Sequence, residues 1–250
     1  MNKNQWKSFC DFRQSFKQQV LEWNKLVPAL PDLQKKAAQL AGSPDYPFEN
    51  PIVYNTDLDK ITAEDQIKLI VIGDNPGKDE QLNKNQRYLC GQAGKLAEGF
   101  FKNHPELGIE FRRNVIILNK TPVHSAKTAQ LKTIIKQGGE QVEELILTSQ
   151  KWMAQQTAQL HQVLEGTQLW LVGYSELKEG HFFCPYRDAL KNAYKDAPNA
   201  WQNVYVYQHF SMNRFTIDLN DFSNQNPRLN LMAQLSALGT QHKNEIFSDK

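Results

Sequence analysis

Hydrophobic residues along the chain follow two different periods, and these periods alternate through most of the sequence. Near the amino terminus apolar residues recur every three or four positions, which predicts an amphipathic helix over residues 5–24. A second helix is expected at about 31–41, and it should end at Gly42 because glycine tolerates the left-handed cap conformation. The segment 43–51 contains three prolines and is expected to be a loop.

The rest of the chain alternates between short apolar runs and helical patterns. The apolar runs are rich in β-branched and aliphatic residues, which predicts strands. Strands separated by helices are typical of right-handed crossovers in a parallel sheet that is covered on both faces. The strands are expected at 68–72, 114–118, 168–172 and 203–207, and the helices at 91–103, 141–164, 185–195 and 228–238.

These patterns predict an α/β fold with three layers, α/β/α, around a central four-stranded parallel sheet. Residues 1–50 form a helical extension, either packed on the main domain or mobile as an arm. The α/β domain is expected to occupy residues 51–240, and residues 241–250 form a polar tail that frays at the end of the chain.

Composition narrows the class of protein without naming a function. The chain has 250 residues and a net charge of +2, which neither demands nor forbids a nucleic-acid partner. Its three cysteines, Cys10, Cys90 and Cys184, stand far apart, which argues against a disulfide framework or a thiolate metal site. No apolar run is long enough for a signal peptide or a membrane span. We therefore expect a soluble, cytoplasmic, monomeric protein without a membrane or metal partner.

Polar residues follow the predicted strands, at the edge of the sheet where open parallel sheets bind ligands. The first strand runs into Gly73-Asp74-Asn75-Pro76-Gly77, and the second ends at Asn119. The fourth runs into a segment that begins Gln208-His209. Three of the four strand exits thus carry a side chain that can hydrogen-bond a planar polar ligand.

The segment GDNPGK, residues 73–78, does not fit a nucleotide-binding P-loop. That loop needs GxxxxGK followed by Ser or Thr, whereas here it is one residue short and Asp79 follows Lys78. A carboxylate at that place would repel a phosphate, and an ordinary turn is the plainer interpretation. Further along, Gly91 and Gly94 open a helix, and free backbone N–H groups at a helix start suit a phosphate.

Four motifs, taken in order, resemble the signatures of the uracil-DNA glycosylase superfamily. The resemblance spans about residues 68–215, more than half of the chain. Its glycine-rich segment is similar to that of the thermostable, iron–sulfur branch, whereas the first motif is similar to those of the mismatch-specific and single-strand-selective branches. The motifs are GDNPG (73–77), RYLCGQAGKL (87–96), VIILN (115–119) and HFSMNR (209–214).

The resemblance implies excision of uracil from DNA and a role for each matching residue. Asn75 stands where the family places the residue that positions the attacking water. Asp74 stands where the iron–sulfur branch carries an acidic residue implicated in catalysis. Asn119 matches the asparagine that reads the hydrogen-bonding edge of uracil, and His209 matches the histidine that stabilises charge on the uracil carbonyl.

Other matching residues are assigned to the base pocket or to the DNA backbone. Leu89 falls at the place of the ring that stacks on the flipped base, with Tyr88 adjacent and Gly73 also at the base. The wedge that fills the gap left by the base is one of Phe210, Met212, Asn213 and Arg214. The residues expected to contact the DNA backbone or to act as the wedge are Lys78, Gly91, Gly94, Ser211, Met212, Asn213 and Arg214.

The sequence departs from the family pattern in two further respects. The iron–sulfur branch has four cysteines at characteristic places, and this chain has three scattered ones, so we predict no cluster and no other cofactor. The last motif usually reads His-Pro-Ser, and here Phe210 replaces the proline.

Two alternatives to uracil excision remain open. The first alternative is a glycosylase for another deaminated base, such as hypoxanthine or xanthine. The second is a catalytically weak nucleic-acid-binding protein with the same fold. In the second case the wedge and the phosphate-binding loops would matter, whereas Asn75 and His209 would not. Taken singly, Asn119 could also satisfy loop backbone groups, and His209 could be a surface histidine. DNA is the expected partner in each of these interpretations.

Overall fold

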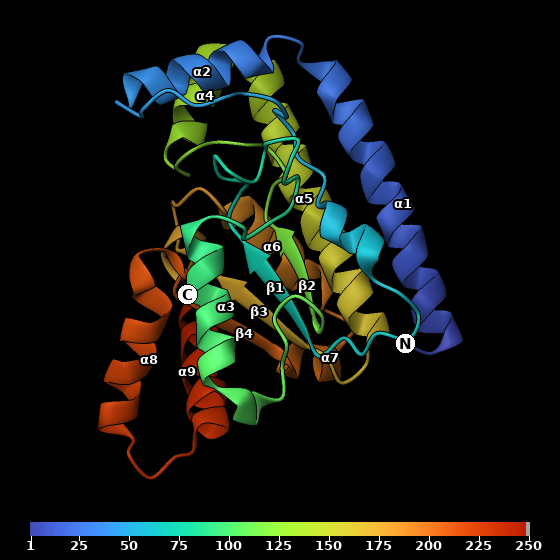
Figure 1. Ribbon diagram of the computed structural model, residues 1–250, viewed down its shortest axis with the longest axis vertical. Coiled ribbons are helices and arrows are strands. Elements are labelled where there is room, and N and C mark those ends of the chain that lie inside the picture. Colours follow the sequence, from blue (N-terminus) through green and yellow to red (C-terminus); the bar gives the residue numbers. More distant parts are fainter. Residues whose placement is uncertain (249–250) are drawn as a thin grey trace.

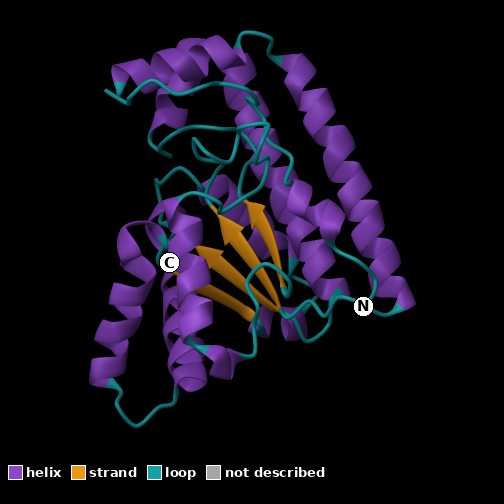
Figure 2. Ribbon diagram, in the orientation of Figure 1, coloured by secondary structure: helices purple, strands orange, loops and turns teal. Residues whose placement is uncertain are grey.

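Four parallel strands form the centre of the molecule, in the order β2-β1-β3-β4 (Figure 2). The computed structural model describes residues 1–248. The central strand β1 is buried along its whole length, as its continuous apolar sequence requires. The α/β prediction is confirmed, and each strand lies within one residue of the predicted run. The strands are β1 Leu69–Gly73, β2 Val115–Asn119, β3 Gln168–Val172 and β4 Val204–Tyr207.

Helices flank this sheet on both sides (Figure 1). Helix α3 lies on one face of the sheet, and α9 packs on β4, whereas α5 and α6 pack against each other on the opposite face. The α-helices are α1 Lys3–Leu26, α2 Leu30–Leu40, α3 Gln92–Asn103, α4 Gln130–Gly138, α5 Glu140–Val163, α6 Cys184–Ala193, α7 Pro198–Gln202, α8 Arg214–Gln225 and α9 Leu231–Phe247. Short 3-10 turns occur at η1 Thr56–Lys60, η2 Pro105–Leu107, η3 Tyr174–Leu177 and η4 Ser211–Asn213.

The largest departure from the predicted elements concerns the carboxyl-terminal end of the chain. The sequence predicts a helix over 228–238 and then a polar tail, whereas α9 continues to Phe247. The helix persists because Ile246 and Phe247 are buried, with the Phe247 ring 4.8 Å from that of Trp201. The last two residues of the predicted tail, 249–250, lie outside the described residues.

Helices α4, α7 and α8 are absent from the predicted elements. Helix α8 buries only Phe215 and Leu219 and is otherwise rich in Asn, Asp and Ser, so its apolar stripe is too narrow for the sequence pattern to reveal. Helices α4 and α7 have nine and five residues, which is too short for several turns of a repeated pattern.

The amino-terminal helices pack on the α/β domain and share its core. Helix α1 lies along α5, and α2 lies against α4 (Figure 1). The ring of Phe16 is completely buried, 5.8 Å from Trp152 of α5 and 5.4 Å from Tyr54 in the segment before β1. No helix within residues 1–248 is both long and apolar enough to cross a bilayer.

Truncation of Phe16 should therefore destabilise the whole protein. We expect Phe16→Ala to lower the free energy of unfolding by about 3–5 kcal/mol, because it opens a cavity between α1 and α5. Leu21→Ala is the matched control on the same helix, where the side chain is 57% exposed, and should change stability by about 0.5 kcal/mol or less. Denaturant unfolding measures the change in unfolding free energy for both variants. If both changes are small and equal, α1 does not contribute to the cooperative core.

Candidate functional site

Three strand exits meet at the carboxyl edge of the sheet, and each supplies a polar side chain. Asp74 directly follows β1. Asn119 is the last residue of β2, and Lys120 comes directly after it. His209 comes two residues after the end of β4. The exits of β1 and β2 remain paired beyond the strands, because the Lys120 amide donates to the Gly73 carbonyl over 3.0 Å. These side chains therefore stand on a rigid base formed by the sheet.

Asn119 is buried, with only 2% of its surface exposed. It is paired in register with Gly73, where a Cβ atom would overlap with Asn119 Oδ1, so only glycine leaves room for the amide. Its Nδ2 group is buried and has no hydrogen-bond partner among the residues that the structure describes. An unsatisfied buried donor costs about 1–3 kcal/mol, which marks Asn119 as a group that is suited to a ligand.

A buried ion pair connects the exits of β1 and β2. The ammonium of Lys120, whose side chain is 0% exposed, lies 2.5 Å from Asp74 Oδ1 and donates to the Val172 carbonyl over 2.6 Å. The sequence did not point to Lys120, because a lysine that follows a strand is ordinarily expected to be exposed to solvent. The only signal was its position directly after Asn119, at the edge of a parallel sheet.

His209 is held as a neutral imidazole. The Ser211 backbone amide donates to His209 Nδ1 over 3.0 Å, and the Ser211 hydroxyl lies 2.8 Å from the same nitrogen. Because a backbone N–H can only donate, Nδ1 is an acceptor and the proton is on Nε2. Burial lowers the pKa of His209, against the opposing effect of Asp74, so the ring is uncharged at neutral pH.

The side chain of Asn75 is committed to the loop that follows β2. Its Nδ2 donates to Ser125 Oγ over 3.0 Å and to the Ser125 carbonyl over 3.1 Å. Its Oδ1 accepts from the Thr128 hydroxyl over 2.9 Å. Asn75 therefore fastens two loops together, and its amide hydrogens are already used without a water or ligand.

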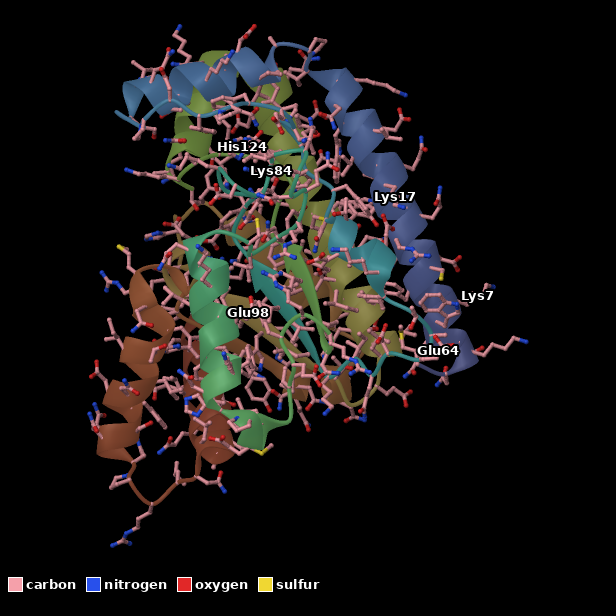
Figure 3. The ribbon with its side chains drawn as sticks, viewed as in Figure 1. Lys7, Lys17, Glu64, Lys84, Glu98 and His124 are labelled. Carbon is pink, nitrogen blue, oxygen red and sulfur yellow. The ribbon has the colours of Figure 1, made fainter. Side chains whose placement is uncertain are left out.

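A buried histidine holds the same loop from the other side. The carbonyl of Pro76 accepts from His124 Nδ1 over 2.8 Å, so His124 Nε2 accepts from the Tyr46 hydroxyl over 3.0 Å. Burial lowers the pKa of His124 to about 4, which keeps the ring neutral. Figure 3 shows His124 beyond the strand ends, below α2 and α4. The proline-rich segment 43–51 is thereby tied to the GDNPG motif.

Neither candidate for the stacking residue presents a free face. Tyr88 is 0% exposed, and its hydroxyl donates to the Val53 carbonyl over 2.5 Å, so the ring belongs to the core. Leu89 is 3% exposed with φ of 49°, its amide donates to Glu80 and its carbonyl accepts from Arg112. Both residues are thus fixed by contacts within the protein, which argues against the expectation that Tyr88 or Leu89 stacks on a base.

The two glycines at the start of α3 have structural reasons for their identity. A Cβ atom at Gly94 would overlap with the Leu89 carbonyl, so Gly94 allows the preceding loop to fold onto α3. A Cβ atom at Gly91 would lie 3.3 Å from Asp79 Oδ2, so a carboxylate already stands near the helix start. These contacts argue against the expected phosphate site at Gly91 and Gly94.

The HFSMNR motif forms a tight turn in which some side chains are buried and others are exposed. Phe210 is 1% exposed and stacks on Phe215 at 4.6 Å, so it anchors the turn and is not available as a wedge. Met212 is 74% exposed, and both Met212 and Asn213 adopt positive φ, of 52° and 56°. Arg214 is exposed at the first residue of α8. The turn thus presents an apolar tip flanked by polar groups.

Cationic side chains project from several loops at this edge of the sheet. Lys78 is exposed in the β1 exit, where its ammonium lies 5.8 Å from the centre of the Tyr46 ring. Lys127 is exposed on the β2 exit and Arg214 after the β4 exit, whereas the exposed Asp79 opposes them.

A cavity of about 1230 Å³ lies elsewhere, between α6, α9 and the segment after β3. Lys178, Arg187, Lys191 and Glu245 contribute to its walls, and none of the residues at the strand exits described above does. Within residues 1–248 no group of three or more His, Cys, Asp or Glu side chains is arranged to hold a metal ion, and the three cysteines are unpaired.

Comparisons with protein-family models, curated proteins and solved structures found no match for this chain. The class of protein that the fold defines is an α/β protein with a four-stranded parallel sheet, flanking helices and additional amino-terminal helices. Three polar side chains from the strand exits, Asp74, Asn119 and His209, lie at the carboxyl edge of that sheet.

Glu80 joins the two loops of the site and should make stability depend on pH. Its carboxylate accepts from the Leu89 amide over 3.0 Å and from the Gly77 amide over 3.3 Å. Burial raises the pKa of Glu80 from 4.5 to about 7. The pKa of Glu80 is therefore higher in the folded protein than in the unfolded chain. Its contribution to the free energy of unfolding is fully present below about pH 4.5, and it is lost as the pH rises through about 7.

We expect Glu80→Gln to remove this dependence, since the amide oxygen still accepts from Leu89 and carries no charge. The difference in unfolding free energy between parent and variant should change by up to about 3 kcal/mol between pH 4.5 and 8. Asp79→Asn, at an exposed neighbour, should leave the slope nearly unchanged. Denaturant titrations across this range provide the test, and a difference that is constant with pH would refute the assignment.

Proposed function

We propose that this protein is a DNA glycosylase that hydrolyses the bond between a flipped uracil and its deoxyribose. One observation carries the proposal, namely the convergence of Asp74, Asn119 and His209 from three strands at one edge of the sheet. Each has an atom without a partner among the described residues: Asp74 Oδ2, Asn119 Nδ2 and His209 Nε2. The arrangement offers a negative charge, an amide and a neutral N–H donor.

The amide of Asn119 supports recognition of uracil. One carboxamide offers a donor and an acceptor together, and the O4 and N3–H edge of uracil requires that pair. Cytosine presents the opposite pattern, which would leave buried polar groups mismatched at a cost of about 1–3 kcal/mol. The unpartnered Nδ2 group of Asn119 would gain its missing acceptor from O4 of the base.

Asp74 and His209 supply complementary electrostatic effects for hydrolysis. The bond between C1′ and the base nitrogen breaks, and its electron pair leaves with the base. The sugar becomes cationic, which the Asp74 carboxylate stabilises, while His209 Nε2–H donates to the carbonyl oxygen on which negative charge develops. A water oxygen then bonds to C1′ and loses one proton to Asp74, which passes it to the departed base.

The hydrogen bonds favour Asp74 over Asn75 as the residue that handles the water. Asn75 is engaged by Ser125 and Thr128, and an amide cannot accept a proton as a base. The carboxylate of Asp74 has one oxygen bound to Lys120 and its other oxygen unpartnered among residues 1–248. Asn75 then acts by holding the loop that carries Asp74.

The surface around the site is compatible with a flipped nucleotide. Met212 is an exposed apolar side chain on a tight turn, and apolar wedges of this kind enter the stack of bases. Lys78, in the β1 exit, and Arg214, at the start of α8, are exposed cations, and in this proposal they bind phosphates of the DNA. Because Asn119 is buried, the base reaches it only when the covering side chains move aside, and binding must supply that energy as well as the cost of unstacking.

The proposal is tested with oligonucleotides that contain uracil, hypoxanthine, xanthine, thymine or cytosine. We expect the parent to release uracil, and Asn119→Asp to lower that rate by about 10²-fold or more while excision of cytosine rises relative to uracil. An ionised aspartate presents only acceptors, so it loses the contact to O4 and accepts from the cytosine amine. Single-turnover rates on each substrate measure the change.

The other outcomes separate the alternatives. Release of hypoxanthine or xanthine without uracil would favour a glycosylase for those bases. No release of any base, with retained DNA binding, would favour a nucleic-acid-binding protein. An unchanged uracil rate in Asn119→Asp would show that this residue does not contact the base.

Removal of His209 should affect the chemical step and not the binding step. The charge that His209 meets exists only in the transition state, so His209→Ala should lose about 10²-fold in single-turnover cleavage with little change in DNA affinity. His181→Ala, at an exposed histidine after β3, is the control and should cleave at the parental rate. Parental cleavage by His209→Ala would remove the main support for this mechanism.

A further inference from the structure

The buried ammonium of Lys120 has three hydrogen-bond acceptors within the protein. It lies 2.5 Å from Asp74 Oδ1, 2.6 Å from the Val172 carbonyl and 3.4 Å from the Gly73 carbonyl. The ring of Phe183 lies on a further side, 5.1 Å from the nitrogen. Three acceptors match the three hydrogens of an ammonium, so the group is protonated and its hydrogens are all used.

A buried lysine is costly, and a purely structural site would hold an apolar residue at less cost. Taking two charges out of water is not repaid by their attraction alone, so a buried ion pair is weak evidence for a role in stability. The surroundings are nevertheless shaped around the pair. A Cβ atom at Gly173, which has a φ of 95°, would overlap with Asp74 Oδ1, so the β3 exit leaves space for this carboxylate.

We propose that Lys120 is a positioning residue that acts through Asp74, an inference that rests on the proposed function. By binding Oδ1, Lys120 fixes the carboxylate so that Oδ2 faces the site, and it connects Asp74 to the ends of β1 and β3. Lys120 does not touch the base or the sugar, because its hydrogens are directed at Asp74, Val172 and Gly73.

The same geometry excludes Lys120 as a nucleophile. Attack on the sugar C1′ would need a free electron pair on the nitrogen, and a protonated, fully bonded ammonium has none. Lys120 therefore forms no covalent bond to the DNA, and in the proposed function water is the group that bonds to C1′. Borohydride, which reduces an imine to a stable amine, should not trap the protein on uracil-containing DNA.

A double-mutant cycle distinguishes action through Asp74 from an independent effect. We expect Lys120→Met and Asp74→Asn each to lower single-turnover uracil excision by about 10²-fold, with affinity for uncleaved DNA nearly unchanged. If Lys120 acts only through Asp74, the double variant should cleave no more slowly than the slower single variant. Lys132→Met, at an exposed lysine of α4, controls for loss of a positive charge and should cleave like the parent.

A second cycle, on stability, needs no catalytic activity. Each single variant leaves one charge buried without its partner, whereas the double variant leaves none. We therefore expect the midpoint of denaturant unfolding to fall further in both single variants than in the double variant. If the two side chains contributed to stability independently, the loss of stability in the double variant would instead equal the sum of the losses in the two single variants.

The outcomes separate this inference from the proposed function. If the parent excises uracil and Lys120→Met cleaves at the parental rate, or if the losses in rate multiply, the positioning role is overturned. Trapping by borohydride that disappears in Lys120→Met would overturn it as well. If the parent excises no base but the stability cycle shows coupling, the proposed function fails while the ion pair stands.

Discussion

The ion pair between Lys120 and Asp74 determines how the loops at the carboxyl edge are arranged. It joins the exit of β1 to the exit of β2, and the bond from Lys120 to the Val172 carbonyl extends the connection to the end of β3. A buried charge without its partner is strongly unfavourable, so neither side chain can leave without the other. The orientation of the Asp74 carboxylate, and thus the electrostatics of the site, follows from this constraint.

Around the pair, the loops are fastened by side chains whose own polar groups are satisfied within the protein. Asn75 binds the loop after β2, His124 connects the GDNPG motif to Tyr46, and Glu80 joins that motif to the segment before α3. Asn119, at the end of β2, differs from these three side chains, because its Nδ2 group is buried and has no hydrogen-bond partner within residues 1–248. The network holds the loops in place, and in the proposed function the free Nδ2 group of Asn119 binds the base.

The aromatic core explains how the last motif is held while its tip remains exposed. Phe210 stacks on Phe215, which also contacts the rings of Trp170 and Tyr207 from the sheet. Where the resemblance leads one to expect proline, a buried phenylalanine anchors the turn through packing. Met212 can then project from a turn with two residues at positive φ, because the strain is opposed by the buried rings on either side.

Local hydrophobic runs and their order along the chain were enough to predict the four strands and their parallel arrangement between helices. The same runs placed Asn119 and His209 at strand exits. The tertiary structure alone decided that Lys120 is buried against Asp74, that Tyr88 belongs to the core, and that α9 continues to its buried end. Such contacts join residues far apart in the chain. Their energies depend on the burial and charge that the folded neighbours create, and no local pattern carries that information.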